Sequence, residues 1–379
     1  MKFLKRDLKM LKFATGAFFL FYNKEENFDK LMEEYLIKDF FKTKQVNDSI
    51  LRPLGAGLSV LYPLIVGVLV HNMYVAQIGI LGAFSYLAFQ RRSIVYNIKA
   101  TSIHSVCLIV GFLLGSFVAH FMFLLPFAIS IISFLGFMVI KIFKIPKPGH
   151  FFVVMLFATA TSIHLSLSQV PSVILYLGVG TLSGLLNAVL ISFIEKLPWK
   201  SEINNDNKLS LKDKYYVLLY EQPKILLDGI TFTFVLFVAG YIAYLLRNDF
   251  GYWVLISSAA VLSGEELKII KTRYHGRIVG SIVGLLIGAG LTLLNLSIVE
   301  IVLVLMLLNI LVEYFMPRNY ALANFFTNPL VILMSLLTHV ASPTFLILSR
   351  LNGIVLGSIV AALLIKFMSY ALRINNRDY

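Results

Sequence analysis

The sequence contains few charged residues and almost no cysteine. Charged side chains make up 14% of the chain, whereas about 25% is usual in a soluble domain. Cys107 is the only cysteine, so no disulfide can form within the chain. The seven histidines include no pair at the spacing of a metal site. We therefore expect neither a metal nor a cofactor.

Motifs for catalysis and for nucleotide binding are also missing. No Walker loop occurs, so direct ATP drive is not encoded in these residues. No Ser, Cys or Asp stands beside a credible base in a recognisable motif, and we expect the protein not to be an enzyme. The net charge of +13 could suit a nucleic acid, but no basic segment has an accompanying nucleic-acid motif. Positive loops at the inner side of a membrane explain the charge better.

Long apolar runs fill most of residues 53–195 and 225–371. The chain is 58% hydrophobic and its mean hydropathy is +0.83. Because a helix needs roughly 20 apolar residues to cross a bilayer, we predict an all-α integral membrane protein in contact with lipid. About twelve transmembrane helices are predicted, at residues 53–70, 73–90, 100–118, 121–142, 151–168 and 172–194, and again at 225–246, 250–264, 274–294, 297–315, 322–340 and 345–371. The span at 250–264 is short, which suggests a broken or re-entrant helix.

The distribution of lysine and arginine predicts the orientation. With an even number of spans, 30 of the 33 Lys and Arg residues lie in segments on one side of the membrane. Arg247 and Arg350 fall toward the other side, and Lys366 can reach the inner surface from the end of the last span. The positive-inside rule therefore places both termini in the cytoplasm. Residue usage rich in Lys, Asn and Ile suggests a low-GC bacterium as the source.

The chain also repeats itself. Four glycines recur 173 positions later, in the pairs Gly111 and Gly284, Gly115 and Gly288, Gly180 and Gly353, and Gly184 and Gly357. An even number of spans in each half makes the predicted six-helix repeats parallel. The predicted units are an amphipathic cytoplasmic segment (1–52), a first repeat (53–194), a cytoplasmic linker (195–224), a second repeat (225–371) and a cytoplasmic tail (372–379).

Glycines at four-residue spacing predict close helix packing in the second repeat. Without side chains, one face of each helix can approach a neighbour closely. Such seams also suit a homo-oligomer, or surfaces that slide during transport. The predicted packing glycines are Gly276, Gly280, Gly284, Gly288, Gly353 and Gly357.

Polar residues between 313 and 329 are candidates for a substrate path. Pro317 would break or kink a span, and polar groups at membrane depth need partners in the protein or in a wet cavity. A cationic Arg318 could hold a carboxylate, and it could equally be a positive-inside arginine in a loop. Glu300 and Arg350 could form an ion pair, either as a structural contact or as a proton-linked switch.

These residues carry a resemblance to a known family. The run Tyr252-Trp253-Val254-Leu255, the later Arg273…Arg277-Ile278-Val279-Gly280 and the segment Glu313…Arg318-Asn319-Tyr320-Ala321…Asn328-Pro329 are similar to the fusaric acid resistance (FUSC-like) or aromatic acid exporter membrane module. Arg350…Gly353…Gly357 resembles the last part of that module. The resemblance covers residues of about 250–365, and the first half follows as a weaker copy.

The resemblance implies efflux of aromatic or other organic acids through a bacterial inner membrane. We therefore expect a transporter that exports small organic anions and is able to use the proton gradient. A passive organic-anion channel of the same fold and a non-transporting scaffold for envelope or lipid assembly are the alternatives. The candidate residues of the path are Arg273, Arg277, Glu313, Arg318, Asn319, Asn324, Asn328 and Arg350.

Overall fold

The computed structural model describes residues 42–46, 48–143, 149–163, 165–200, 211–216, 220, 222–264, 267–338 and 342–375. Within these ranges all regular structure is helical and no strand occurs, which confirms the predicted fold class. Most of the predicted amphipathic segment (1–41), part of the linker, the end of the short span (Glu265 and Glu266) and residues 376–379 lie outside the described residues.

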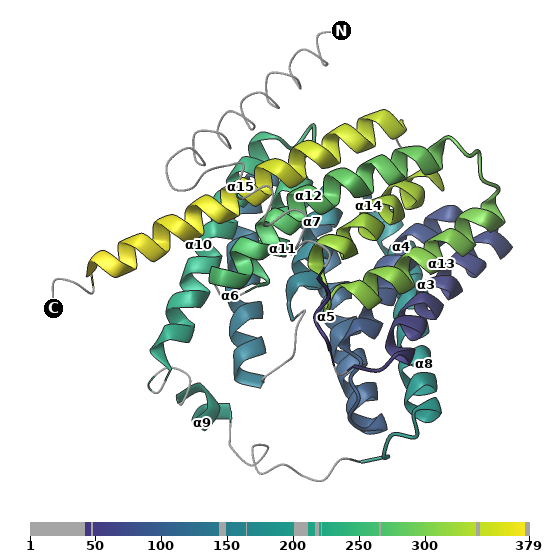
Figure 1. Ribbon diagram of the computed structural model, residues 1–379, viewed down its shortest axis with the longest axis horizontal. Helices are drawn as coiled ribbons and strands as arrows, with labels where there is room; N and C mark the ends of the chain where they lie inside the picture. Colours follow the sequence, from purple (N-terminus) through teal and green to yellow (C-terminus); the bar gives the residue numbers. More distant parts are fainter. Residues whose placement is uncertain are drawn as a thin grey trace, which may run out of the picture.

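The helices follow the predicted apolar runs in order (Figure 1). The first half contains α3 (Leu51–Leu69), α4 (Met73–Ala83) with its 3₁₀ extension η2 (Phe84–Ala88), α5 (Ile94–His120), α6 (Leu125–Phe143), α7 (Phe151–Thr161) and α8 (Val170–Ile194). The short helix α9 (Leu211–Tyr216) lies in the linker. The second half contains α10 (Pro223–Leu245), α11 (Gly251–Leu262), α12 (Leu267–Thr292), α13 (Ile298–Phe315), α14 (Tyr320–Leu336) and α15 (Pro343–Asn375).

Two helices extend beyond the predicted spans into charged sequence. The predicted span 274–294 corresponds to α12, which begins at Leu267 and carries Arg273 and Arg277 within the helix. The predicted span 345–371 corresponds to α15, whose membrane-length apolar part is Pro343–Ala371 and which continues to Asn375. Lys and Arg are good helix formers, so a change of polarity does not end a helix.

Side-chain caps mark where several helices begin. Asn72, Ser93 and Asn319 accept hydrogen bonds from the first turns of α4, α5 and α14. Ser297 and Glu300 form a reciprocal capping box at the start of α13. In α3, Pro63 has no N–H to donate to the carbonyl of Ser59, and the Ser183 hydroxyl of α8 donates to that carbonyl instead at 2.8 Å.

Eight helices in the described residues are long and apolar enough to cross a membrane. The other four apolar helices are shorter, and they are α4 with η2, α7, α11 and α14. They occupy the second and fifth positions of each half, so the two halves share the same sequence of long and short helices. The predicted twelve spans therefore comprise eight full-length helices and four short ones.

The short helices are buried inside the protein. Every residue from Val254 to Leu262 of α11 is buried, and so is most of α4 and α7. The short helices pack against long ones, with α4 on α8, α11 on α15, α7 on α5 and α14 on α12. Non-helical backbone at membrane depth is tolerated when protein surrounds it. Helices enclosed in this way need not match the thickness of the bilayer.

The order of packing partners is the same in both halves. In the first half α3 contacts α4 and α8, and α5 contacts α7 and α8. The helices 173 residues later make the corresponding contacts, since α10 packs on α11 and α15 while α12 packs on α14 and α15. Between the halves, α3 packs on α13 and α10 packs on α6. The first helix of each half thus contacts the fourth helix of the other half.

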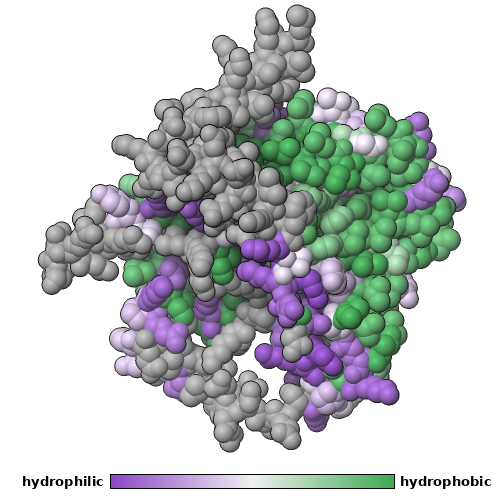
Figure 2. Space-filling view, viewed as in Figure 1, coloured by the Kyte–Doolittle hydropathy of each residue, from purple (hydrophilic) through white to green (hydrophobic). Residues whose placement is uncertain are grey.

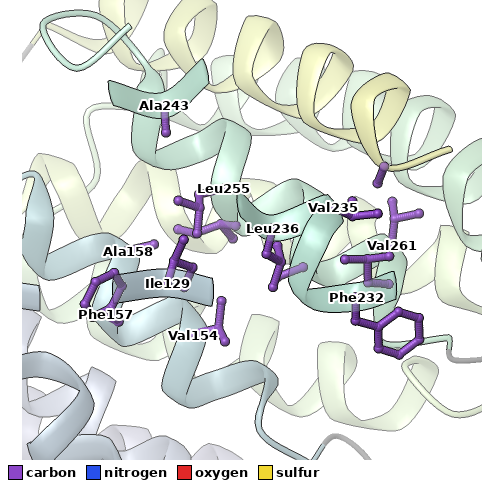
Figure 3. Close-up of a cluster of buried hydrophobic side chains, with 14 of the residues drawn as sticks. Ile129, Val154, Phe157, Ala158, Phe232, Val235, Leu236, Ala243, Leu255 and Val261 are labelled. Atoms are coloured by element: carbon purple, nitrogen blue, oxygen red, sulfur yellow. The ribbon is translucent and has the colours of Figure 1, made fainter. Parts of the chain in front are cut away.

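A large apolar cluster joins the two halves (Figure 3). Ile129 of α6 and Val154 and Phe157 of α7 meet Val235 of α10 and Leu255 of α11. Where α6 and α10 cross, the rings of Phe137 and Phe232 pack edge to face at 5.1 Å. The seam between α6 and α10 is thus built from apolar side chains.

Apolar side chains cover a broad face on the side of the molecule where α3 and α13 lie (Figure 2). Leu303 and Leu307 of α13 and Leu54 and Ile65 of α3 are among these exposed residues. Lipid tails can cover such a surface without the penalty it would carry in water. The exposed face therefore supports contact with the bilayer.

Candidate functional site

The site is positioned by the close approach of α12 and α14. A Cβ atom at Gly280 would meet the carbonyl oxygen of Ala321, and one at Gly284 would meet the carbonyl oxygen of Asn324. On the other side, Gly353 and Gly357 of α15 face Trp253, Val254 and Ser257 of α11. The predicted packing glycines thus bring α11, α12, α14 and α15 together around a group of buried polar side chains.

Two arginines point at two asparagines in this group. Arg277 of α12 donates from Nη1 to Oδ1 of Asn324 at 3.1 Å, and Arg350 of α15 donates from Nε to Oδ1 of Asn328 at 2.6 Å. Arg277 is 6% exposed and Arg350 is 3% exposed. Because Asn324 and Asn328 are one turn apart on α14, they share a face. The two guanidinium groups therefore lie near each other and their like charges repel.

No described acid compensates these two charges. Within the residue ranges given above, helices α11, α12, α14 and α15 contain no Asp or Glu residue. Nε of Arg277 and Nη1 of Arg350 are buried and have no hydrogen-bond partner among the described residues. Arginine stays protonated in proteins, so the arrangement offers two cationic donors to an acceptor from outside the four helices.

Aromatic rings cover the faces of two guanidinium groups. Arg350 lies 4.1 Å from the ring centroid of Trp253, and Arg273 lies 4.6 Å from that of Tyr320. Stacking leaves the planar N–H edge of a guanidinium available for in-plane hydrogen bonds, which is the geometry that suits a carboxylate. Arg273 is one turn before Arg277, and its Nη1 donates to Ser263 Oγ at 2.6 Å.

Three other candidates lie apart from the arginine pair. Arg318 is in the turn between α13 and α14, where its Nη1 donates to the carbonyl of Tyr314 at 2.7 Å. Asn319 caps α14. Glu313, near the end of α13, forms an ion pair with Arg52 of α3 at 2.9 Å. The structure thus divides the predicted set into a buried cluster and a second group near the end of α13.

The predicted ion pair between Glu300 and Arg350 is not formed. Glu300 accepts hydrogen bonds from the backbone and the hydroxyl of Ser297, both at 2.7 Å, at the exposed start of α13. Arg350 is buried and bonded to Asn328 instead. The carboxylate caps its own helix, where the positive end of the helix dipole favours it.

A charged network lies near the end of α13 and was not predicted from the sequence. Arg52 bridges Asp48 at 2.8 Å and Glu313 at 2.9 Å, and the Ser49 hydroxyl donates to Glu195. Arg91 lies 3.7 Å from Glu195. Because residues 1–52 read as a separate segment, nothing in the sequence pattern connected Arg52 with a residue more than 250 positions away.

Glu195 follows the last turn of α8 and has a perturbed acidity. Burial raises the pKa of its carboxyl group, the positive charge of Arg91 partly opposes this rise, and the negative charge of Asp48 adds to it. Its side chain is 6% exposed. The network therefore contains a carboxyl group that takes up a proton more readily than an ordinary glutamate.

A metal centre is not evident in the described part of the chain. Within it, no three His, Cys, Asp or Glu side chains come together in a way that could hold a metal ion. The site instead consists of cations, amides, hydroxyl groups and aromatic rings, which are the groups that recognise anions.

Comparison with known proteins shows a similarity over the residues of this site. Residues 238–364 match the family model described as fusaric acid resistance protein-like, and this range contains Trp253, Arg277, Asn324, Asn328 and Arg350. This part of the chain is similar to that family of membrane proteins. The match confirms the resemblance predicted from the sequence. The module runs from within α10 to within α15, so it holds all four helices of the site.

A curated relative supports a membrane protein. The chain is similar to the uncharacterized membrane protein YvaC of Bacillus subtilis (strain 168), with 29% identity over 141 residues. The similarity covers 37% of this chain and 22% of YvaC. No solved structure matches the chain.

Proposed function

We propose that this protein is a transporter that exports small organic anions, in particular aromatic carboxylic acids, across a bacterial plasma membrane. The observation that carries the proposal is the pair of buried arginines, Arg277 and Arg350, on helices without acidic residues. Nε of Arg277 and Nη1 of Arg350 are buried and have no hydrogen-bond partner among the described residues. A carboxylate is the natural acceptor for such donors.

The surroundings of the pair favour a substrate that combines a carboxylate with an aromatic ring. Trp253 and Tyr320 present ring faces beside the guanidinium groups, and aromatic rings pack well against other rings. Arg273, one turn from Arg277, extends the line of cations toward the start of α12. The family description of the matched module agrees with an organic-acid substrate.

The proposed architecture is two parallel six-helix repeats with both termini in the cytoplasm. The common offset of 173 residues, the shared order of packing partners and the matching positions of the short helices support it. An inside-negative potential favours outward movement of an anion by about 2.3 kcal/mol per charge per 100 mV. Export therefore has a driving force even without a coupled proton.

The deciding experiment measures efflux from cells that overproduce the protein and are preloaded with labelled benzoate or other aromatic acids. Efflux should be faster than in control cells, and Arg350→Gln and Arg277→Gln should each remove the increase. Arg247→Gln is the matched control, because Arg247 is exposed and stacks on Tyr244 of its own helix. Addition of an uncoupler at controlled potential distinguishes proton drive from potential drive.

Other outcomes assign the protein differently. Conductance measured as large single-channel events in planar bilayers would identify a passive channel. An absence of flux for every acid tested, with the protein present in the membrane, would leave the scaffold as the remaining function. Unchanged efflux in Arg350→Gln would show that the substrate path lies elsewhere.

A further inference from the structure

The arginine pair places two positive charges in the interior of the protein, and their burial is unfavourable whatever the substrate is. Arg277 and Arg350 are buried, their side-chain hydrogen bonds to described residues go to the neutral amide oxygens of Asn324 and Asn328, and their like charges repel each other. An uncompensated charge at membrane depth costs several kcal/mol. Unlike a lysine or a histidine, an arginine cannot escape this cost by releasing its proton.

Among the described residues, no acidic side chain contacts the pair to neutralise its charge. A carrier can neutralise an unloaded site if a carboxylate swings toward it, but α11, α12, α14 and α15 contain no Asp or Glu. Glu300 caps α13 at an exposed position, and Glu313 is engaged by Arg52. Neither acid contacts the pair.

The same helices supply further donors for an anion. The hydroxyl groups of Ser257, Ser281 and Ser358 are buried without a hydrogen-bond partner among the described residues. Ser281 is one turn after Arg277 on α12, and Ser257 packs against Gly357 of α15. Hydroxyl groups can donate to a halide as well as to a carboxylate.

From these observations we propose that the protein is an anion exchanger, in which each outgoing organic anion is replaced at Arg277 and Arg350 by an incoming small anion, such as chloride. This rests on the proposed transport function and adds the second ion. The step that exchanges access between the two sides of the membrane occurs with the site loaded, because an unloaded site would carry two uncompensated positive charges through the bilayer. Net export then depends on a small anion outside the cell.

Counterflow in proteoliposomes tests the exchange. The full-length protein is reconstituted, the potential is clamped with potassium and valinomycin, and uptake of labelled benzoate is measured. Vesicles contain unlabelled benzoate, chloride or only the bulky buffer anion HEPES. We expect internal benzoate or chloride to accelerate uptake about tenfold or more, since each 1.4 kcal/mol of barrier changes a rate tenfold.

Two results separate the failure of this inference from the failure of transport. Equal benzoate uptake into all three kinds of vesicle would overturn the exchange and leave export intact. No uptake into any vesicle, with the protein correctly reconstituted, would overturn both the export function and the exchange.

A binding measurement gives a readout that does not depend on flux. Thermal unfolding of the purified protein in detergent is followed in sodium chloride, sodium benzoate and sodium HEPES at equal ionic strength. Chloride and benzoate should raise the melting temperature in proportion to the logarithm of their concentration. The double variant Arg277→Gln/Arg350→Gln should lose this dependence, and Arg247→Gln should keep it.

Folding of the double variant is expected because it removes two repelling buried charges and leaves amide groups that can donate to Asn324 and Asn328. A melting temperature of the unmodified protein that is the same in all three salts would overturn the proposal that an anion occupies the pair.

Discussion

The amide oxygen of Asn328 sets the charge that the buried site presents. It accepts from Nε of Arg350 without neutralising it. A carboxylate of the same length would make the same hydrogen bond and supply a negative charge. Asparagine at this position thus keeps Arg350 in a fixed orientation and leaves its charge available to a ligand.

Asn328→Asp should stabilise the protein and abolish transport. A hydrogen bond to a charged group contributes about 1.5–3 kcal/mol. This exceeds the roughly 1 kcal/mol of the neutral bond that is lost, from Nδ2 of Asn328 to the carbonyl of Asn324, so unfolding should require a higher temperature. The new carboxylate would also compete with the substrate for Arg350, and efflux should fall at least about tenfold. Thermal unfolding in detergent and efflux from loaded cells measure the two effects.

The matched control is Asn187→Asp in α8. Asn187 is also buried, and its Nδ2 donates to the carbonyl of Ser183 at 2.9 Å, just as Nδ2 of Asn328 donates to the carbonyl of Asn324. A carboxylate there loses the donor and has no cation beside it, so the same substitution should destabilise the protein by about 1–3 kcal/mol or more. Stabilisation at both positions would contradict the special role of Asn328.

Glu195 should make stability depend on pH. Its pKa is raised in the folded state, mainly by burial, so the folded protein binds the proton more tightly than the unfolded chain. This contribution is fully present below the ordinary glutamate pKa of 4.5 and is lost as the pH rises through the higher folded pKa. The melting temperature should fall over this window in the native protein, and Glu195→Gln should flatten that part of the profile. A fall of equal size in the variant would assign the dependence to other groups.

The contact between α12 and α14 controls the geometry of the arginine site. Gly284→Leu would push a side chain against the backbone of α14 at Asn324. Overpacking of this kind costs about 1–3 kcal/mol, and it would move Arg277 away from its acceptor. We expect folded but less stable protein with little efflux.

Gly290→Ala provides the comparison for Gly284→Leu within the same helix. A Cβ atom at Gly290 would meet nothing within 4 Å. Alanine is a better helix former than glycine by about 1 kcal/mol, so stability and efflux should be equal to or above those of the native protein. Similar losses in both variants would show that α12 tolerates no side chains for another reason.

The seam between α3 and α13 combines a buried apolar cluster with polar contacts. Arg52 pairs with Asp48 and Glu313, and Nδ2 of Asn309 donates to the carbonyl of Ala56 at 2.8 Å. Removing one partner of a buried ion pair costs about 3–5 kcal/mol. Because these side chains are only partly buried, the loss of stability on removing one of them should be at or below that range.

Arg52→Gln should therefore destabilise the protein more than Glu313→Gln. Loss of Arg52 leaves Glu313 and Asp48 without their cation, whereas loss of Glu313 leaves Arg52 paired with Asp48. The double variant should be less destabilised than the sum of the two single variants. Thermal unfolding of the three variants measures this coupling, and strict additivity would show that the pair contributes nothing across the seam.

Periodicity and composition predicted where the helices lie better than which helices pack against one another. Each of the twelve apolar runs corresponds to a helix because only helices satisfy the backbone in a bilayer. The sequence indicated a short span at α11, but the lengths of α4, α7 and α14 could not be predicted, since a helix enclosed by protein no longer has to match the membrane. The pairing of Arg350 with Asn328 depends on how α15 packs against α14, and no sequence spacing contains that information.

Across the whole molecule, the two halves share their helix order but differ in charge. Arg277 of the second half corresponds to His104 of the first half at the offset of 173 residues, and Arg350 corresponds to Leu177. The first half therefore lacks both cations of the site. The four-helix group α11, α12, α14 and α15 concentrates the proposed anion site in one half, while the other half packs against it through the apolar cluster.

The orientation of this assembly follows from the positive-inside rule and can be measured with single cysteines. In a Cys107→Ser background, Lys44→Cys and Lys200→Cys are predicted to face the cytoplasm, whereas Ser168→Cys and Asn248→Cys face the exterior. All four positions are exposed. A membrane-impermeant maleimide should label positions 168 and 248 in intact cells, and positions 44 and 200 only after lysis.

Each labelling result tests a particular helix. Labelling of positions 44 and 200 in intact cells, with 168 and 248 protected, would reverse the orientation. Positions 200 and 248 are separated by α10 alone, so equal labelling of both would show that α10 does not cross the membrane. Position 168 is separated from position 200 by α8 and from the basic segment around Lys141 by the short helix α7. Exterior labelling at 168 would therefore require the chain to cross the bilayer between residues 141 and 168. The helix in this stretch, α7, has 11 residues, so it would have to be enclosed by protein along the crossing.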